Sequence, residues 1–343
     1  MGKYKKIYVL APFGYATGGV ELAHQLVDYL RNKGEEAYIV YAKGDNSISE
    51  DQTITSSYSK YNIKTTSVIY DNPDNIMVLP EIYFEFVLLY KFIQIACWWM
   101  SVDNRYVKVS FIEKIRFKKS IKDKLSLIKS YLLGYRSNLV NDDKLLKKES
   151  ARIFHLYQSH YAQFFLYSKG FSKLLPLSDY INLDLIGNLN SPKKDIVLYN
   201  PAKGYEFTKK IISKMPDVEF VALKGLNRDQ LRNLLETSKL YIDFGHFPGK
   251  DRLPREAVSN GCCIITGRLG ASYFYEDVPI NDEYKFDVKE KNVPYIIEKI
   301  KYVLANYNDC KHDFDFYRSR IRREREIFHN EIEELFWHNS NRL

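Results

Sequence analysis

Residues 6–41 read KIYVLAPFGYATGGVELAHQLVDYLRNKGEEAYIVY, and this stretch decides the fold that we expect for the chain. The apolar run at 6–11 is typical of a strand buried on both faces, and 37–41 predicts a second such strand. Between them, a loop with three glycines leads into a helical pattern over 20–33. Strand, loop, helix and strand form a βαβ unit, so the pattern predicts a parallel sheet.

The same alternation of strands and helices continues through the 343 residues, with a break rich in Gly, Asn, Ser and Pro at 187–194. We therefore expect an α/β chain of two doubly wound, Rossmann-like domains, over residues 1–187 and 188–312, that face each other across a cleft. The strands that we expect after the first two include 76–79, 93–100, 152–157, 195–199, 218–223, 240–244 and 262–266.

Composition narrows the class of protein. Hydrophobic residues make up 45% and charged residues 27%, which is typical of a globular chain and not of a disordered one. No apolar run reaches the roughly 18 residues of a membrane-spanning helix, and the first run is too short for a signal peptide. We expect a cytoplasmic protein whose four cysteines (Cys97, Cys262, Cys263 and Cys310) are reduced and lack metal-site spacing.

The net charge of +8 is concentrated in residues 105–136, which hold ten Lys or Arg and two acidic residues. We regard 105–150 as a basic insertion in the first domain. Its apolar residues Ile121, Leu125, Ile128 and Leu132 recur at helical spacing and are flanked by lysines. This pattern predicts peripheral binding to an anionic membrane surface, at its inner face. The alternatives are packing of the stripe on the first domain and a nucleic-acid surface, of which the latter is disfavoured because no known binding module accompanies the lysines.

Glycines at the ends of predicted strands point to an anion site. Gly18 and Gly19 let backbone N–H groups approach a phosphate at a helix N-terminus, although a plain tight turn would also use them. The GxGxxG pattern and the P-loop lysine are both missing, which disfavours nicotinamide and ATP binding. Lys203 and Gly204 follow another strand, and this lysine is either a phosphate ligand or solvated. The turn with Gly270 and Ala271 is either structural or a phosphate cradle.

The most informative loop is residues 243–257, DFGHFPGKDRLPREA. Its three cations, Lys250, Arg252 and Arg255, suit a diphosphate, and the carboxylate of Glu256 suits ribose hydroxyls. His246 either faces the cleft or has a structural role. We therefore predict a nucleotide site in the second domain.

Three residues are candidates for a base or an orienting group in catalysis: Asp103, His160 and Glu21. Asp103 follows a predicted strand, where the functional groups of such sheets gather, but it could also form a turn or a helix cap. His160 could likewise cap a helix. Because no DxD motif stands in a strand context, we predict no metal and no cofactor, with the leaving group stabilised by cations and helix N-termini.

Taken in order, these motifs resemble the GT-B-fold glycosyltransferases near the retaining family-4 type, along nearly the whole chain. The matching motifs are Gly18-Gly19-Val20-Glu21, Lys203-Gly204 and Pro254-Arg255-Glu256-Ala257 followed by Gly261. The chain departs from the family at Pro248, where the family carries its first Glu, a residue that helps to hold the donor sugar.

The resemblance implies a metal-independent hexosyltransferase, retaining in outcome, that uses a UDP- or GDP-sugar donor and a glycan or lipid-linked acceptor. Its expected pathway is cell-surface polysaccharide biosynthesis. The resemblance also implies that the helix within 313–343 crosses back to the first domain. Two alternatives remain: a non-catalytic nucleic-acid-binding protein that uses the basic segment, and a sugar-nucleotide epimerase of GT-B shape.

Overall fold

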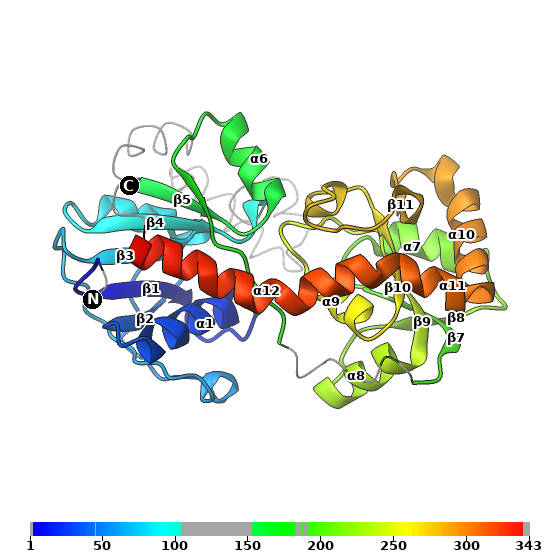
Figure 1. The fold of residues 1–343 in the computed structure, drawn as a ribbon, viewed down its shortest axis with the longest axis horizontal. Coiled ribbons are helices and arrows are strands. Elements are labelled where there is room, and N and C mark those ends of the chain that lie inside the picture. Colours follow the sequence, from blue (N-terminus) through cyan, green and yellow to red (C-terminus); the bar gives the residue numbers. More distant parts are fainter. Residues whose placement is uncertain are drawn as a thin grey trace, which may run out of the picture.

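The first of two parallel sheets forms the N-terminal half of the molecule (Figure 1). The computed structural model describes residues 3–44, 46–103, 153–182, 187, 189 and 191–338. The strand order in this sheet is β2-β1-β3-β4-β5-β6, so the direction of winding reverses between β1 and β3. Its strands are β1 (Ile7–Pro12), β2 (Ala37–Ala42), β3 (Ile76–Pro80), β4 (Gln94–Trp99), β5 (Ile153–Tyr157) and β6 (Leu174–Pro176).

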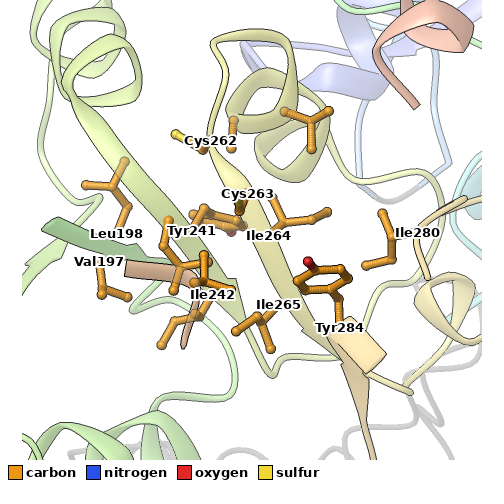
Figure 2. Packing of buried hydrophobic residues seen from close by; sticks show 14 of the residues in the cluster. Val197, Leu198, Tyr241, Ile242, Cys262, Cys263, Ile264, Ile265, Ile280 and Tyr284 are labelled. Carbon is orange, nitrogen blue, oxygen red and sulfur yellow. The ribbon is translucent and has the colours of Figure 1, made fainter. Parts of the chain in front are cut away.

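The second sheet has the order β11-β10-β9-β7-β8, and its winding reverses between β7 and β9. Residues such as Val197, Ile242 and Ile264 are fully buried on it, as Figure 2 shows. Both sheets are doubly wound and parallel, which confirms the predicted fold class. The strands are β7 (Lys194–Tyr199), β8 (Glu219–Ala222), β9 (Ser238–Asp243), β10 (Cys263–Gly267) and β11 (Lys285–Phe286).

Helices cover both sheets because each presents an apolar stripe to a strand layer. In α1, for example, Leu22, Leu26 and Leu30 are buried on the first sheet. The α-helices are α1 (Gly18–Asn32), α6 (His160–Ser168), α7 (Tyr205–Ile212), α8 (Arg228–Thr237), α9 (Arg252–Ser259), α10 (Val293–Ala305), α11 (Tyr307–Cys310) and α12 (Asp315–Glu333). Helices of the 3₁₀ type are η1 (Ser56–Tyr58), η2 (Glu81–Leu88), η4 (Ala271–Tyr273), η5 (Asp282–Tyr284), η6 (Glu290–Asn292) and η7 (Lys311–Phe314), and the π-type helix is η8 (Glu334–His338).

The C-terminal helix α12 crosses from the second domain to the first, as the red helix in Figure 1 shows. Tyr317 and Ile321 near its start belong to the second core, whereas Phe328 and Ile332 near its end belong to the first. Phe328 stacks on Trp98 of β4, with ring centroids 6.3 Å apart. The predicted return of this helix is therefore confirmed.

The structure tests the prediction about the cysteines but not the one about the basic segment. All four cysteines are buried and none forms a disulfide within the described residues, as expected, and burial raises the pKa of Cys262 to about 11. The basic segment 105–136 lies outside the described residues, so its helical stripe stays a prediction. Within the described part of the chain, no helix is long and apolar enough to cross a membrane.

Candidate active site

A pocket of about 550 Å³ lies where the strand ends of the two sheets face each other. The first domain contributes the start of α1 with its two glycines, together with residues that follow β3 and β4. The second domain contributes the turn after β7 and the loop between β9 and α9. Five predicted donor-binding residues line this pocket: Gly18, Gly19, Lys203, Lys250 and Arg252.

Arg252 reaches across the pocket to the first domain. Its Nη1 donates to Oε2 of Glu21 at 2.7 Å, so a predicted donor ligand and a predicted catalytic residue form an ion pair. A Cβ at Gly18 would lie 3.1 Å from the Arg252 Nε, so a larger residue there would require the Arg252 side chain to shift. Burial alone would raise the pKa of Glu21, but Arg252 and the hydroxyl of Tyr61 lower it overall.

Lys203 occupies the second-domain wall of the pocket. Its Nζ forms an ion pair with Asp251 and lies 3.5 Å from Oδ2 of Asp243. Gly204 precedes α7 with a φ of 65°, and a Cβ there would lie only 2.5 Å from the Gly245 backbone nitrogen. This position therefore requires glycine. Burial lowers the pKa of Lys203, while Asp243 counteracts that change.

The other two predicted cations take part in a buried quartet, which consists of Asp179, Lys250, Arg255 and Glu324. The Arg255 guanidinium binds Asp179 through two bonds of 3.0 and 2.5 Å and Glu324 at 2.8 Å. The Lys250 Nζ lies 3.2 Å from Oδ1 of Asp179 and 3.1 Å from Oε1 of Glu324. Two positive and two negative side chains thus balance one another where both domains meet α12.

The quartet changes the interpretation of Arg255. Backbone oxygens of Asp251 and Lys250 accept its remaining N–H groups, so all five of its donors have partners inside the protein. Its side chain is 1% exposed. In this arrangement every donor of Arg255 is engaged within the protein, which favours a structural role over the predicted role in donor binding.

Asp103 and His246 meet at the junction of the domains. His246 Nε2 lies 2.6 Å from Oδ2 of Asp103, and the hydroxyl of Tyr161 donates to Oδ1 at 3.2 Å. Beside them, the backbone N–H of Val102 donates to the Pro248 carbonyl at 3.2 Å. The loop after β9 is therefore docked on the end of β4, and it brings a predicted catalytic carboxylate and a predicted donor-site histidine together.

His160 lies apart from the cluster of Lys203 and Arg252. It begins α6, where its backbone N–H donates to Asp277 at 2.8 Å, and Tyr161 donates to the same carboxylate at 2.9 Å. Its ring borders a separate pocket of about 300 Å³ near α12. Ser159 caps this helix through its side chain.

Glu256 and the Gly270 turn lie behind the pocket wall. Glu256 stands one helical turn after Arg252 on α9 and is 6% exposed, and burial raises its pKa although Arg252 lowers it. Gly270 has a φ of 66°, and the following Ala271 N–H donates to the Phe247 carbonyl at 2.8 Å. The turn therefore anchors the loop that carries His246, which supports the structural alternative for it.

Sequence reasoning missed several carboxylates at the pocket and in the quartet. Glu81 is buried in the pocket wall and accepts the Met100 N–H at 3.1 Å. Asp179 and Glu324 come from segments far apart in the sequence, so no local pattern could link them to Lys250. Asp251 is adjacent to two predicted cations, and that alternation of charge was the one available signal. No three His, Cys, Asp or Glu residues cluster as metal ligands within the described ranges.

Comparison with models of protein families gives no match, and comparison with curated proteins gives none either. Solved structures match over almost the full length. A sucrose-phosphate synthase from Thermosynechococcus elongatus has a TM-score of 0.64 at 12% identity, covering 96% of this chain and 98% of that one. Anabaena HepE in complex with UDP and glucose has a TM-score of 0.61 at 10% identity, covering 97% and 99%.

A glycosyltransferase from Rickettsia africae also matches, with a TM-score of 0.52 at 14% identity over 96% of this chain and 98% of that chain. The two facing doubly wound domains and the returning α12 agree with these matches. The fold implied by the resemblance is thereby confirmed: this chain has the GT-B fold of glycosyltransferases.

Proposed function

We propose that this chain is a glycosyltransferase that uses a nucleoside diphosphate sugar as donor. The observation that carries the proposal is the pocket at the facing strand ends, where a glycine loop stands opposite Lys203 and Arg252. These are the groups that bind a diphosphate: cations, and the N-terminus of a helix, α1, that begins at Gly18. The GT-B fold supports the same function.

To catalyse sugar transfer, the protein must stabilise the nucleoside diphosphate as it leaves the sugar. Lys203 and Arg252 would hold its phosphate oxygens and offset the negative charge that develops as the glycosidic bond breaks. Because two cations and a helix N-terminus supply this charge, we propose that no metal is required. Glu256, close behind Arg252, is proposed to bind the ribose hydroxyls after a side-chain rotation.

The finer assignments follow from the resemblance and are part of the proposal. The donor is a UDP- or GDP-hexose, and the complexes of Anabaena HepE with UDP and UDP-glucose favour UDP. The acceptor is a glycan or a lipid-linked glycan in polysaccharide synthesis. The sugar is transferred to it with retention of its anomeric configuration. We propose Asp103, paired with His246, as the group that orients the acceptor hydroxyl.

A nucleotide panel tests the donor assignment. Calorimetric titration with UDP, GDP and ADP in EDTA should give binding for UDP or GDP, and Glu256→Gln should weaken it about 5- to 150-fold through loss of the ribose contact. Sugar transfer should persist in EDTA. Absence of binding to every nucleotide, or activity restored only by Mn²⁺ or Mg²⁺, would contradict the proposal. An altered sugar on the nucleotide without transfer would identify an epimerase instead.

Vesicle binding tests the proposed location. The lysines of segment 105–136 should bind the protein to anionic vesicles and not to neutral ones, and salt should weaken the binding. Replacing Lys118, Lys119, Lys122 and Lys124 with Gln should abolish it and leave nucleotide affinity unchanged. Equal binding to both kinds of vesicle, or binding to neither, would exclude the peripheral membrane role.

A further inference from the structure

The pocket is electrically balanced before any ligand enters it. Among the described residues that line it, three are acidic (Glu81, Asp179 and Asp251) and three are basic (Lys203, Lys250 and Arg252). A metal-free diphosphate would bring at least two further negative charges into this space. Since burying unpaired charge is costly, some of the existing ion pairs must give way when it binds.

The structure shows which ion pairs can give way. Lys250 cannot, because two carboxylates hold it inside the quartet and its side chain is 10% exposed. Lys203 and Arg252 have side chains that are 24% and 28% exposed. Arg252 pairs with Glu21, and Lys203 pairs with Asp251 while keeping the buried Asp243 as a second partner at 3.5 Å. These two pairs, Lys203–Asp251 and Arg252–Glu21, are called the pocket pairs below. Water and ligands reach them, so their carboxylates can be exchanged for phosphate oxygens.

We propose that Glu21 and Asp251 are internal competitors of the donor, placed in the free protein where phosphate oxygens bind. This inference rests on the proposed function and adds a control element to the same site. On donor binding, the diphosphate displaces Asp251 from Lys203 and Glu21 from Arg252. Each cation then exchanges a carboxylate for a more highly charged phosphate group. It therefore still makes one charge-assisted hydrogen bond, with a new acceptor.

The competition also links the donor to the contact between domains. Glu21 belongs to α1 of the first domain and Arg252 to α9 of the second, so displacement of Glu21 removes one interdomain ion pair. The contact of Asp103 with His246 and the backbone bond from Val102 to Pro248 remain. Donor binding therefore replaces a direct ion pair across the cleft with contacts made through the diphosphate.

The test uses inorganic pyrophosphate as a probe that needs no nucleotide specificity. Its affinity is measured by calorimetry in EDTA for wild type, Glu21→Gln, Asp251→Asn and the double variant. Each single substitution removes the competing charge and keeps the shape, so we expect roughly 3- to 30-fold tighter binding, and more in the double variant. The matched control is Glu333→Gln, which removes the negative charge that α12 places on Lys33, the residue after α1, outside the pocket, and it should leave pyrophosphate affinity unchanged.

The outcomes separate this inference from the proposed function. Unchanged or weaker pyrophosphate binding in the variants, or binding to none of the proteins, overturns the competition. Tighter pyrophosphate binding without binding of any nucleotide keeps the competition and contradicts the donor assignment. If Glu21→Gln does not fold, the more exposed Asp251→Asn decides alone, with thermal unfolding confirming that this variant is native.

Discussion

The buried quartet and the pocket pairs are both clusters of opposite charges at the domain junction, but they differ in exposure and in partners. In the quartet, Arg255 and Lys250 share two carboxylates, and the guanidinium is 1% exposed. In the pocket pairs, each cation is about a quarter exposed, and Asp251 or Glu21 contacts it from a loop or across the pocket. The surroundings of these cations thus differ, and we propose that the quartet is structural and that the cations of the pocket pairs bind a ligand.

The two clusters differ because their acidic residues come from different parts of the fold. Asp179 follows β6, and Glu324 lies midway along α12, so the quartet joins three separate segments. Asp251 is a loop neighbour of the cations, and Glu21 stands at the other wall of the pocket. Partners from several packed elements fix a charge, whereas a partner on a loop or across a cleft can be displaced.

The largest expected effect comes from breaking the quartet at Arg255. Arg255→Met leaves two buried carboxylates with Lys250 alone, so the free energy of unfolding should fall by about 3–5 kcal/mol in chemical denaturation. The control is Arg268→Met, which removes a surface pair with Asp282 and should cost at most about 1 kcal/mol. A loss of similar size in both variants would remove the distinction between the two kinds of cluster.

A smaller effect is expected on acidification. Burial alone would raise the pKa of Asp179, but Arg255 and Lys250 lower it to about 2, below its ordinary value of 3.8. The folded state then binds its proton less tightly than the unfolded state, so this stability is complete above pH 3.8 and is lost as the pH falls towards 2. The contribution is roughly 2 kcal/mol. Carbon NMR should show the Asp179 carboxyl titrating near pH 2, and a midpoint at or above 4 would contradict the account.

The smallest effect on stability is expected at the pocket pairs. Arg252→Met should lower the free energy of unfolding by no more than about 1 kcal/mol, because the pair with Glu21 is partly exposed. Nucleoside diphosphate affinity should nevertheless fall about tenfold or more, since a charged hydrogen bond to phosphate is lost. Denaturation and calorimetry on the same preparation would reveal this split. A large loss of stability with unchanged affinity would assign Arg252 to structure instead.

Local patterns in the sequence were sufficient for the fold. Apolar runs and helical stripes predicted every strand of the two sheets except the short edge strands β6 and β11, because a buried parallel strand and an amphipathic helix each leave a periodic signal. The glycine loop and Lys203 were located correctly at strand ends, and they line one pocket in the structure. The sequence could not predict that Arg252 lines the pocket while Arg255 is buried in the quartet. That difference depends on which carboxylate, Glu21 or Asp179, lies nearby in space.

The most direct test of the central claim is a crystal structure with the nucleoside diphosphate that binds tightest in the panel. The account predicts phosphate oxygens within hydrogen-bond distance of Lys203 Nζ and the Arg252 guanidinium, with Glu21 and Asp251 displaced and the quartet of Lys250 and Arg255 unchanged. A nucleotide bound elsewhere, or one whose phosphates contact Arg255 while Glu21 still holds Arg252, would contradict it.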